Sequence, residues 1–248
     1  MKRICLLLLL LPALMGASPV SYRAVAVREY PHDPTAYTQG LFFKGDTLCE
    51  STGQYGESSF RMVDLRSGKP FRKLNFTRKY FVEGSVALGG SLFILTWMNR
   101  VIFEYEAGSL KYLSTRAYPY EGWGLCTDGS SLIASDGSSK LYFINPSGFK
   151  LEKVLEVSLE GRPVRFLNEL EWIDGRIWAN VYTTDLIVVI DPENGEVEAT
   201  VDCGGLLPQK LRTSSTDVLN GIAVSDGGAI YLTGKNWPRL YEVELEKL

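Results

Sequence analysis

The stretch WGLCTDGSSLIAS, residues 123–135, contains the unit on which the fold depends. An aromatic residue, Trp123, comes first, and a glycine follows it. A short apolar segment then leads into the turn Asp128-Gly129, and a second apolar segment spans Leu132–Ser135. Apolar segments of this length, bounded by Gly, Asp and Ser, are typical of β-strands joined by turns.

The same unit occurs five times along the chain. Its first residues are spaced 44, 40, 45 and 52 positions apart, and helical periodicity is hard to find between them. The five units begin Gln39-Gly40-Leu41, Glu83-Gly84-Ser85, Trp123-Gly124-Leu125, Asn168-Glu169-Leu170 and Asn220-Gly221-Ile222. Third strands follow the second ones, as in Lys140–Ile144 and Leu186–Ile190. A period of about 40 to 45 residues with four strands is that of a β-propeller blade.

The last unit is one strand short, because Asn220–Leu248 has room for only three strands. The alternating segment Tyr22–Tyr30 precedes the first unit and can supply the fourth. Pairing of the two ends would protect the edges that an open sheet exposes. We therefore predict an all-β fold, a five-bladed β-propeller whose ring is closed by an N-terminal strand in the last blade.

The N-terminus has the features of an export signal. A basic start, Met1-Lys2-Arg3, precedes an apolar run over Ile4–Met15 and the small residues Gly16-Ala17-Ser18. An apolar run of this length is too short for a membrane anchor and typical of a signal peptide. We expect residues 1–17 to be a signal peptide, residues 18–248 to form a single catalytic domain, and the product to be periplasmic or extracellular, with no membrane partner.

Charge and cysteine content narrow the choice of partners. The net charge of −3, with both signs interspersed, gives no basic face for nucleic acid. The predicted mature part has three cysteines, Cys49, Cys126 and Cys203, so at least one has no partner within the chain. We expect buried free thiols, and a Cys49–Cys126 disulfide is the alternative. We expect a monomer.

In a propeller the first residues of the innermost strands ring one mouth of the central channel. Here these positions hold Gln39, Glu83, Trp123, Asn168 and Asn220. Amide, carboxylate and indole groups at equivalent positions indicate a ligand site, because a purely structural ring would repeat one small residue. The aromatic residues near these positions, some of which we expect in the core, are Tyr37, Phe81, Trp97, Trp178, Tyr182 and Trp237.

Glu83 and Lys235 are the candidates for chemistry. Glu83 stands alone in an apolar setting, where loss of water would raise its proton affinity and suit it to general acid/base catalysis. Lys235 follows the second strand of the last unit and is placed to point over the mouth. His32 is the only histidine and fits a turn, so the sequence offers neither a typical catalytic zinc site nor a Ser-His-Asp or Cys-His arrangement.

The whole predicted mature chain resembles the plant-type glutaminyl cyclases and their bacterial relatives. The segments that carry the resemblance, about one set per blade, are residues 32–41 (HDPTAYTQGL), 80–84 (YFVEG), 96–97 (TW), 122–125 (GWGL), 167–172 (LNELEW), 178–180 (WAN), 219–223 (LNGIA) and 233–238 (TGKNWP). The resemblance implies a five-bladed propeller that converts the N-terminal glutamine of a peptide or protein to pyroglutamate, releases ammonia, and needs no metal for catalysis. Some members of this family carry a structural calcium ion in the channel.

The resemblance also implies roles for nine residues. Glu83, Asn168 and Lys235 match the catalytic group, with Glu83 as the proton shuttle, and Gln39 matches a polar substrate binder. Trp97, Trp123, Tyr37, Phe81 and Tyr182 match the walls of the pocket, although relatives often carry Trp at the position of Tyr182.

Two other functions fit the predicted fold. One is a calcium-dependent propeller lactonase, which would need several carboxylates at inner positions, where this ring has one. The other is a propeller that binds peptides without catalysis, for which a lone glutamate with a facing lysine would have no purpose.

Overall fold

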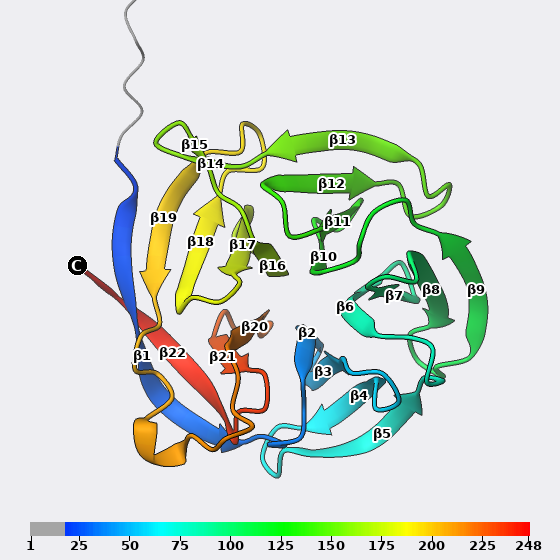
Figure 1. Ribbon diagram of the computed structural model, residues 1–248, viewed down its shortest axis with the longest axis horizontal. Helices are drawn as coiled ribbons and strands as arrows, with labels where there is room; N and C mark the ends of the chain where they lie inside the picture. Colours follow the sequence, from blue (N-terminus) through cyan, green and yellow to red (C-terminus); the bar gives the residue numbers. More distant parts are fainter. Residues whose placement is uncertain (1–17) are drawn as a thin grey trace, which may run out of the picture.

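The computed structural model describes residues 18–248, so the predicted signal peptide lies outside the described residues. These residues form β-strands and one short 3-10 helix, η1 (Gln209–Leu211), with no α-helix among them. Figure 1 shows the sheets arranged around a centre, with β2, β6, β10, β16 and β20 innermost. The arrangement is all-β and propeller-like, as the repeats predict.

Three of the sheets are four-stranded antiparallel meanders. Their strand orders are β2-β3-β4-β5, β6-β7-β8-β9 and β10-β11-β12-β13, so each runs from the centre outward in chain order. Their bounds are β2 Thr38–Lys44, β3 Thr47–Thr52, β4 Ser59–Asp64, β5 Lys69–Asn75, β6 Val82–Leu88, β7 Ser91–Thr96, β8 Val101–Glu106, β9 Tyr112–Ala117, β10 Leu125–Thr127, β11 Leu132–Ser135, β12 Lys140–Ile144 and β13 Leu151–Glu156.

The remaining sheet has eight strands in the order β16-β17-β18-β19-β1-β22-β21-β20. Its bounds are β16 Leu167–Ile173, β17 Arg176–Val181, β18 Leu186–Ile190, β19 Val197–Asp202, β1 Val20–Pro31, β20 Leu219–Val224, β21 Ile230–Gly234 and β22 Arg239–Lys247. A separate hairpin consists of β14 (Ser158–Leu159) and β15 (Arg162–Pro163).

Strand β1 is the segment predicted to complete the last unit. It pairs antiparallel with β22, from Tyr22 opposite Lys247 to Pro31 opposite Arg239. It also pairs in parallel with β19, from Val20 opposite Ala199 onward. The two ends of the described chain therefore lie side by side in one sheet, as Figure 1 shows at β1 and β22.

The inner strands approach one another so closely that the second residue of a unit has almost no room for a side chain. A Cβ atom on Gly84 would lie 2.4 Å from the backbone nitrogen of Leu125, and one on Gly124 would lie 2.0 Å from the carbonyl oxygen of Asn168. The N–H of Gly84 donates to the carbonyl of Trp123 at 2.7 Å. This contact sets the first residues of neighbouring units beside one another.

The fourth unit carries Glu169 at the glycine position. The side chain is buried, and its two oxygens accept the backbone N–H groups of Leu41 at 3.1 Å and of Ile222 at 2.8 Å. Burial, together with the charge of Glu171, raises the pKa of Glu169 well above its ordinary value. One side chain thus ties β16 to β2 and β20.

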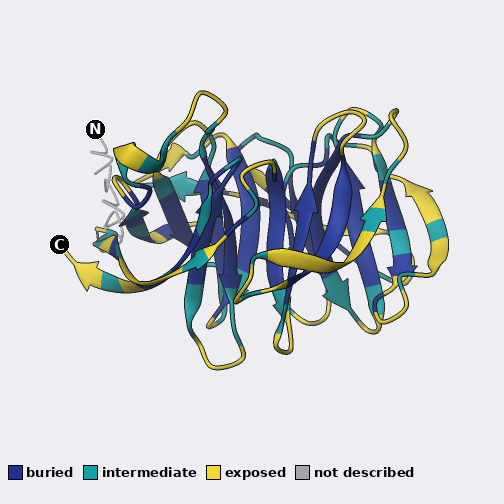
Figure 2. Cartoon of the chain, turned by 90° about the horizontal axis from the view of Figure 1, so that it is seen from below, coloured by how far each residue is buried: buried dark blue, intermediate teal, exposed yellow. Residues whose placement is uncertain are grey.

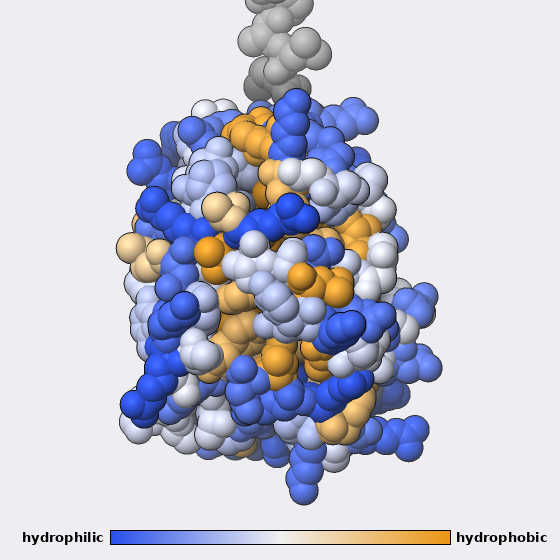
Figure 3. Space-filling model, turned by 90° about the vertical axis from the view of Figure 1, so that its right-hand side faces the viewer, coloured by the Kyte–Doolittle hydropathy of each residue, from blue (hydrophilic) through white to orange (hydrophobic). Residues whose placement is uncertain are grey.

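Apolar side chains fill the space between neighbouring sheets. Phe93 and Leu95 of β7, for example, pack in one cluster with Leu132 and Ala134 of β11. Figure 2 shows the buried residues inside the ring and the exposed ones on the outer strands and loops. On the side drawn in Figure 3, hydrophobic groups are interrupted by hydrophilic ones.

The three cysteines of residues 18–248, Cys49, Cys126 and Cys203, are free and buried. The expectation of buried free thiols is confirmed, and the alternative Cys49–Cys126 disulfide is wrong. Burial raises the pKa of each thiol, to about 12 for Cys49. Thiols with so high a pKa react slowly with oxidants and disulfides.

The only histidine is part of a buried charge network. His32 lies 2.6 Å from the carbonyl oxygen of Trp237 through Nδ1 and 2.9 Å from Oε1 of Glu50 through Nε2. Both neighbours are acceptors, so both ring nitrogens must donate and the ring is an imidazolium. Burial opposes that charge most strongly, but the charge and hydrogen bond of Glu50, together with the carbonyl of Trp237, raise the pKa of His32 overall. Arg61 completes the network through Glu50 at 3.0 Å and Asp33 at 2.7 Å.

Glu50 is the acceptor shared by His32 and Arg61. Burial alone would raise its pKa, but the charges of Arg61 and His32 lower it from 4.5 to about 2. Because the pKa of Glu50 is lower in the folded state, its contribution to stability is present above pH 4.5 and is lost as the pH falls toward 2.

We predict that Glu50→Gln lowers the free energy of unfolding at pH 7 by about 3–5 kcal/mol, because it leaves two buried cations without their counter-charge. Urea unfolding measures the change, and the variant should also lose stability less steeply than the wild type between pH 4.5 and 2. Asp202→Asn is the control, because it breaks only the exposed 3.6 Å pair with Arg23 and should cost less than about 1 kcal/mol. Equal losses in the two variants would contradict the assignment.

Candidate active site

A partly open cavity of about 230 Å³ lies at the end of the ring where the inner strands begin. It is lined by Tyr37, Gln39, Gln54, Phe81, Glu83, Trp97, Trp123, Asn168, Tyr182 and Lys235. All nine residues that the sequence predicts for the site lie in this lining, and Gln54 is the tenth. Their roles in a reaction stay a prediction.

The cavity residues come from equivalent places in different sheets. Gln39, Glu83 and Asn168 are the second residues of β2, β6 and β16, and Trp123 precedes β10. Lys235 directly follows β21. Because the inner strands are held together at the next position along each of them, side chains separated by more than 100 residues in the sequence converge on one space.

Glu83 is the one carboxylate in the cavity lining. Its side chain is 5% exposed. Burial raises the pKa of Glu83 well above its ordinary value, the ammonium of Lys235 opposes this, and the charge of Glu121 adds to it. A raised pKa makes a carboxyl group a better proton acceptor, and such groups serve as general acids and bases in enzymes.

Lys235 presents its ammonium to the same cavity. The Nζ atom lies 4.8 Å from the ring centre of Tyr37 and 4.7 Å from that of Tyr182, which is cation–π geometry. The backbone is fixed by hydrogen bonds to Val218 and Asp217, each of 2.9 Å. Burial lowers the pKa of Lys235, against the opposing charges of Glu83 and Asp217.

Two amides, those of Gln39 and Asn168, complete the polar part of the lining. Asn220 does not line the cavity, although the repeat places it in the ring of first residues. Its Nδ2 donates to Oε1 of Gln39 at 3.2 Å and to the carbonyl of Thr38 at 2.9 Å. Gln39 therefore turns its NH₂ group to the ligand space. The buried Oδ1 of Asn168 has no hydrogen-bond partner among residues 18–248, as expected of a group that meets a ligand.

Aromatic rings form the walls. Phe81 meets Tyr37 and Trp97 edge to face, at ring-centre distances of 6.1 and 5.7 Å. Trp123 and Tyr182 form a second edge-to-face pair at 5.5 Å. Such pairs hold the rings rigid and keep the cavity apolar around its few polar groups.

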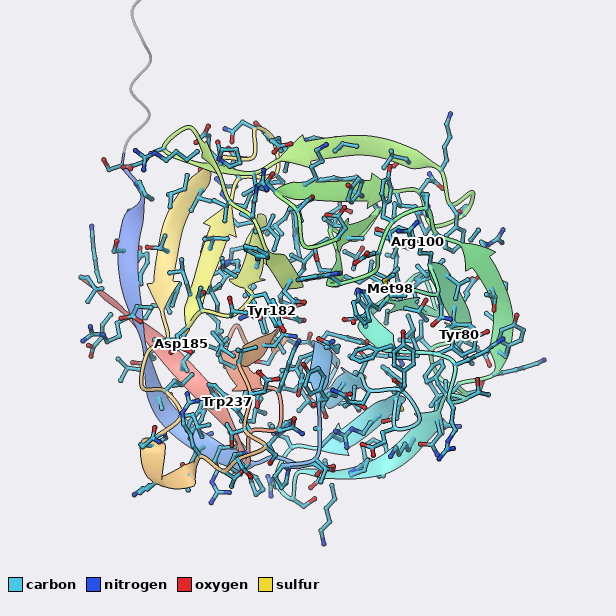
Figure 4. All side chains as sticks on the ribbon, in the orientation of Figure 1. Tyr80, Met98, Arg100, Tyr182, Asp185 and Trp237 are labelled. Carbon is cyan, nitrogen blue, oxygen red and sulfur yellow. The ribbon has the colours of Figure 1, made fainter. Side chains whose placement is uncertain are left out.

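Two tryptophans that the sequence places near the ring lie in the core. Trp178 packs in the apolar cluster between β17 and its neighbours. Trp237 is buried, and its Nε1–H donates to the carbonyl of Asp217 at 2.9 Å. In Figure 4, Trp237 lies away from the centre of the ring, near which Tyr182 lies.

Residues 18–248 hold no group of three or more His, Cys, Asp or Glu side chains that could bind a metal ion. At the centre of the ring, the carboxylate oxygens of Glu169 already accept two backbone N–H groups. The carboxylate of Glu169 is therefore already engaged, and the structural calcium ion that the resemblance allows stays a prediction. None of the described helices is long and apolar enough to cross a membrane.

Comparison with known proteins gives the family. The profile of the glutamine cyclotransferase family matches residues 4–245. A glutaminyl-peptide cyclotransferase of Arabidopsis thaliana is 43% identical over 226 residues, which cover 89% of this chain and 71% of the relative. The chain belongs to the glutamine cyclotransferase family.

One solved structure agrees with this glutamine cyclotransferase assignment, and another shares only the fold. The crystal structure of glutaminyl cyclase from Myxococcus xanthus matches with a TM-score of 0.87 and 38% identity, over 93% of this chain and all of that one. Hydrazine synthase from Kuenenia stuttgartiensis matches with a TM-score of 0.50 and 14% identity, over 88% of this chain and 67% of that one. The second likeness is one of fold alone.

Two residues of this cyclotransferase site were not predicted from the sequence. Gln54 lies in a loop outside the repeated unit, so the repeat carries no signal for it. Glu121 accepts the indole N–H of Trp97 at 2.9 Å and acts electrostatically on Glu83. Its position two residues before Trp123 was the one available signal.

We predict that Glu121→Gln lowers the pKa of Glu83, because the substitution removes a negative charge that raises it. A glutamine can still accept the hydrogen bond from Trp97. The pKa is measured by NMR titration of ¹³C-labelled glutamate carboxyl groups, with Glu83→Gln used to assign the signal. Glu57→Gln, which lies outside this cavity, should leave the pKa unchanged. An unchanged or higher pKa in Glu121→Gln would rule out the coupling.

Proposed function

We propose that Glu83 is the general acid/base with which this chain, a glutaminyl-peptide cyclotransferase, closes the N-terminal glutamine of a peptide into pyroglutamate. The observation that carries the proposal is the cavity itself. It places one buried carboxylate of raised pKa and one buried ammonium inside aromatic walls. Its volume of about 230 Å³ suits a single residue, because pockets for drug-sized ligands measure about 300–1,000 Å³.

The reaction joins the substrate's α-amine nitrogen to its own side-chain carbonyl carbon. Glu83 takes one proton from the attacking amine as the C–N bond forms. It then gives this proton to the departing amide nitrogen, which leaves as ammonia when its own C–N bond breaks. The proton count balances with one carboxylate, and such general acid/base catalysis contributes about 10²–10⁴-fold.

The carbonyl oxygen becomes negative in the tetrahedral intermediate. Lys235 and the Nδ2 of Asn168 are positioned to donate to it, and a lost donor of this kind costs about 10²–10³ in turnover. The unpartnered Oδ1 of Asn168 and the free NH₂ of Gln39 supply an acceptor and a donor for the substrate's amide. Together these groups hold the glutamine folded onto itself, as cyclisation requires.

The aromatic walls keep water from the intermediate. Trp97 and Trp123 both line the cavity, and each is paired with another ring. Excluding water favours attack by the amine over hydrolysis to glutamate. The alternative of a calcium-dependent lactonase has little support, because the cavity lining supplies a single carboxylate. A propeller that only binds peptides does not account for the family.

Further proposals concern the whole chain. The eight-stranded sheet divides at the parallel β1–β19 pair into two four-stranded units, so we count five blades. We also propose that residues 1–17 are removed on export to the periplasm or outside the cell, and that the mature protein is a monomer. Intact mass of the exported protein tests the cleavage, with a product that starts near Ser18 expected.

We predict that Glu83→Gln lowers kcat by about 10²–10⁴-fold while the protein stays folded, because the amide keeps the shape of the carboxyl group but cannot shuttle the proton. Ammonia release from glutaminyl-alanine measures kcat, and thermal unfolding checks the fold. A variant that keeps more than about a tenth of wild-type turnover is incompatible with a general acid/base role.

The same assay in the presence of a chelator tests whether catalysis needs a metal ion. We propose that catalysis needs none, so dialysis against EDTA should leave ammonia release unchanged. Glu152→Gln changes an exposed glutamate on β13 and is the matched control for Glu83→Gln, so its ammonia release should equal that of the wild type with and without EDTA. Loss of activity on chelation, restored by Ca²⁺, would contradict the metal-independent mechanism.

A further inference from the structure

Gln54 is the one residue of the cavity lining that the repeat did not lead us to predict. It lies in the loop between β3 and β4, residues 53–58. Its φ angle is +88°, a backbone conformation that side-chain-bearing residues rarely adopt. Strained residues of this kind persist only where the surroundings hold them, and they cluster at functional sites.

The loop is held by its own hydrogen bonds. The carbonyl oxygen of Gln54 accepts from the N–H of Glu57 at 3.1 Å, the N–H of Ser58 at 2.9 Å and the hydroxyl of Ser58 at 2.8 Å. The same hydroxyl accepts the N–H of Val82 at 3.1 Å. Since Val82 precedes Glu83, the backbone of Gln54 is fixed relative to the strand that carries the proton shuttle.

Aromatic packing holds the start of the loop as well. Gly53 lies against the ring of Phe81, where a Cβ atom would come within 2.3 Å of that ring. Its N–H donates to the carbonyl of Tyr37 at 2.8 Å. The loop therefore has little freedom to move away from the cavity.

The side chain of Gln54 is polar and free. It is exposed at the edge of the cavity, and no hydrogen bond joins its amide to any other residue in the described range. The next residue, Tyr55, is 50% exposed, and its ring centre lies 5.4 Å from that of Phe81. An unpaired amide and a half-exposed ring thus lie together, directly outside the space for the glutamine.

When the N-terminal glutamine of a peptide occupies the cavity, the rest of the peptide must extend out of the cavity across this edge or another one. The first peptide bond after the glutamine has one N–H and one C=O, and a primary amide can pair with both. A ring beside it can pack on the side chain of the second residue. The edge at Gln54 offers both the amide of Gln54 and the ring of Tyr55 on a backbone that is already fixed, so binding requires little ordering of the loop.

We propose that Gln54 and Tyr55 form the subsite for the second residue of the peptide substrate, with Gln54 on the peptide bond and Tyr55 on an apolar or aromatic side chain. The proposal rests on the proposed function of the cavity. It assigns a binding role to Gln54, so the effect of a substitution should depend on whether the substrate has a second residue.

The test compares glutamine amide, which has no second residue, with the peptides Gln-Gly amide and Gln-Phe amide. In Gln54→Ala, KM for both peptides should rise about three- to tenfold, the range of one net hydrogen bond, with kcat little changed. Kinetics with glutamine amide should stay within about twofold. Gln54→Gly also removes the amide but suits the positive φ, so it should show the same substrate dependence without loss of thermal stability.

Tyr55 is tested through the second side chain. Wild type should prefer Gln-Phe amide over Gln-Gly amide, Tyr55→Ala should lose this preference, and Tyr55→Phe should keep it. Tyr112→Ala is the matched control, because Tyr112 is a similarly exposed tyrosine on the outer strand β9.

Two outcomes overturn the subsite. One is an equal loss on glutamine amide and on the peptides, which would make Gln54 part of the glutamine pocket. The other is unchanged KM for peptides in both Gln54 variants. Failure of the proposed function is distinct from these, because then wild-type protein would release no ammonia from any of the three substrates.

Discussion

The architecture depends on the close approach of the inner strands at the second residue of each unit. At Gly84 and Gly124 the neighbouring backbone stands where a Cβ atom would be. Backbones this close can form hydrogen bonds directly, as the N–H of Gly84 does to the carbonyl of Trp123. The residues before the glycines therefore lie at the same height along the axis of the ring. Any larger residue would separate the strands and move the side chains that line the cavity. Glu169 departs from this rule, but its carboxylate reaches the strands of two other units and replaces backbone contact with hydrogen bonds.

Two buried carboxylates show how partners decide the chemistry of a group. Glu50 and Glu83 are both buried, yet the pKa of Glu50 falls to about 2 and that of Glu83 rises. Glu50 has His32 and Arg61 within hydrogen-bonding distance, so its charge is permanently matched. Among residues 18–248, the charges that act on Glu83 are those of Lys235 and of a second carboxylate, Glu121. The first group stabilises the fold, and the second is left able to change its protonation state.

Much of the site could be predicted because it follows the repeat. Glu83 and Asn168 were identified as site residues from their place at the start of a unit, and symmetry then required them to converge. What the repeat does not describe was missed or misplaced. Gln54 belongs to a loop whose conformation depends on Ser58 and Phe81, which no local pattern reveals. Asn220 occupies the right position but turns toward Gln39, since the direction of a side chain depends on its tertiary neighbours.

The pairing of β1 with β22 bears on how the molecule folds. These are the first and last strands of the described chain, and they share a register of nine residue pairs. Contacts so distant in sequence carry the largest loop-closure entropy and form late. The sheets β2–β5, β6–β9 and β10–β13 and the strands β16–β19 are local meanders and can form early, whereas the pairing of β1 with β22 must wait until the last strand has been synthesised. A chain that lacks β22 would leave the facing edges of β1 and β21 unpaired, so the ring can close only in a chain that includes its last strand.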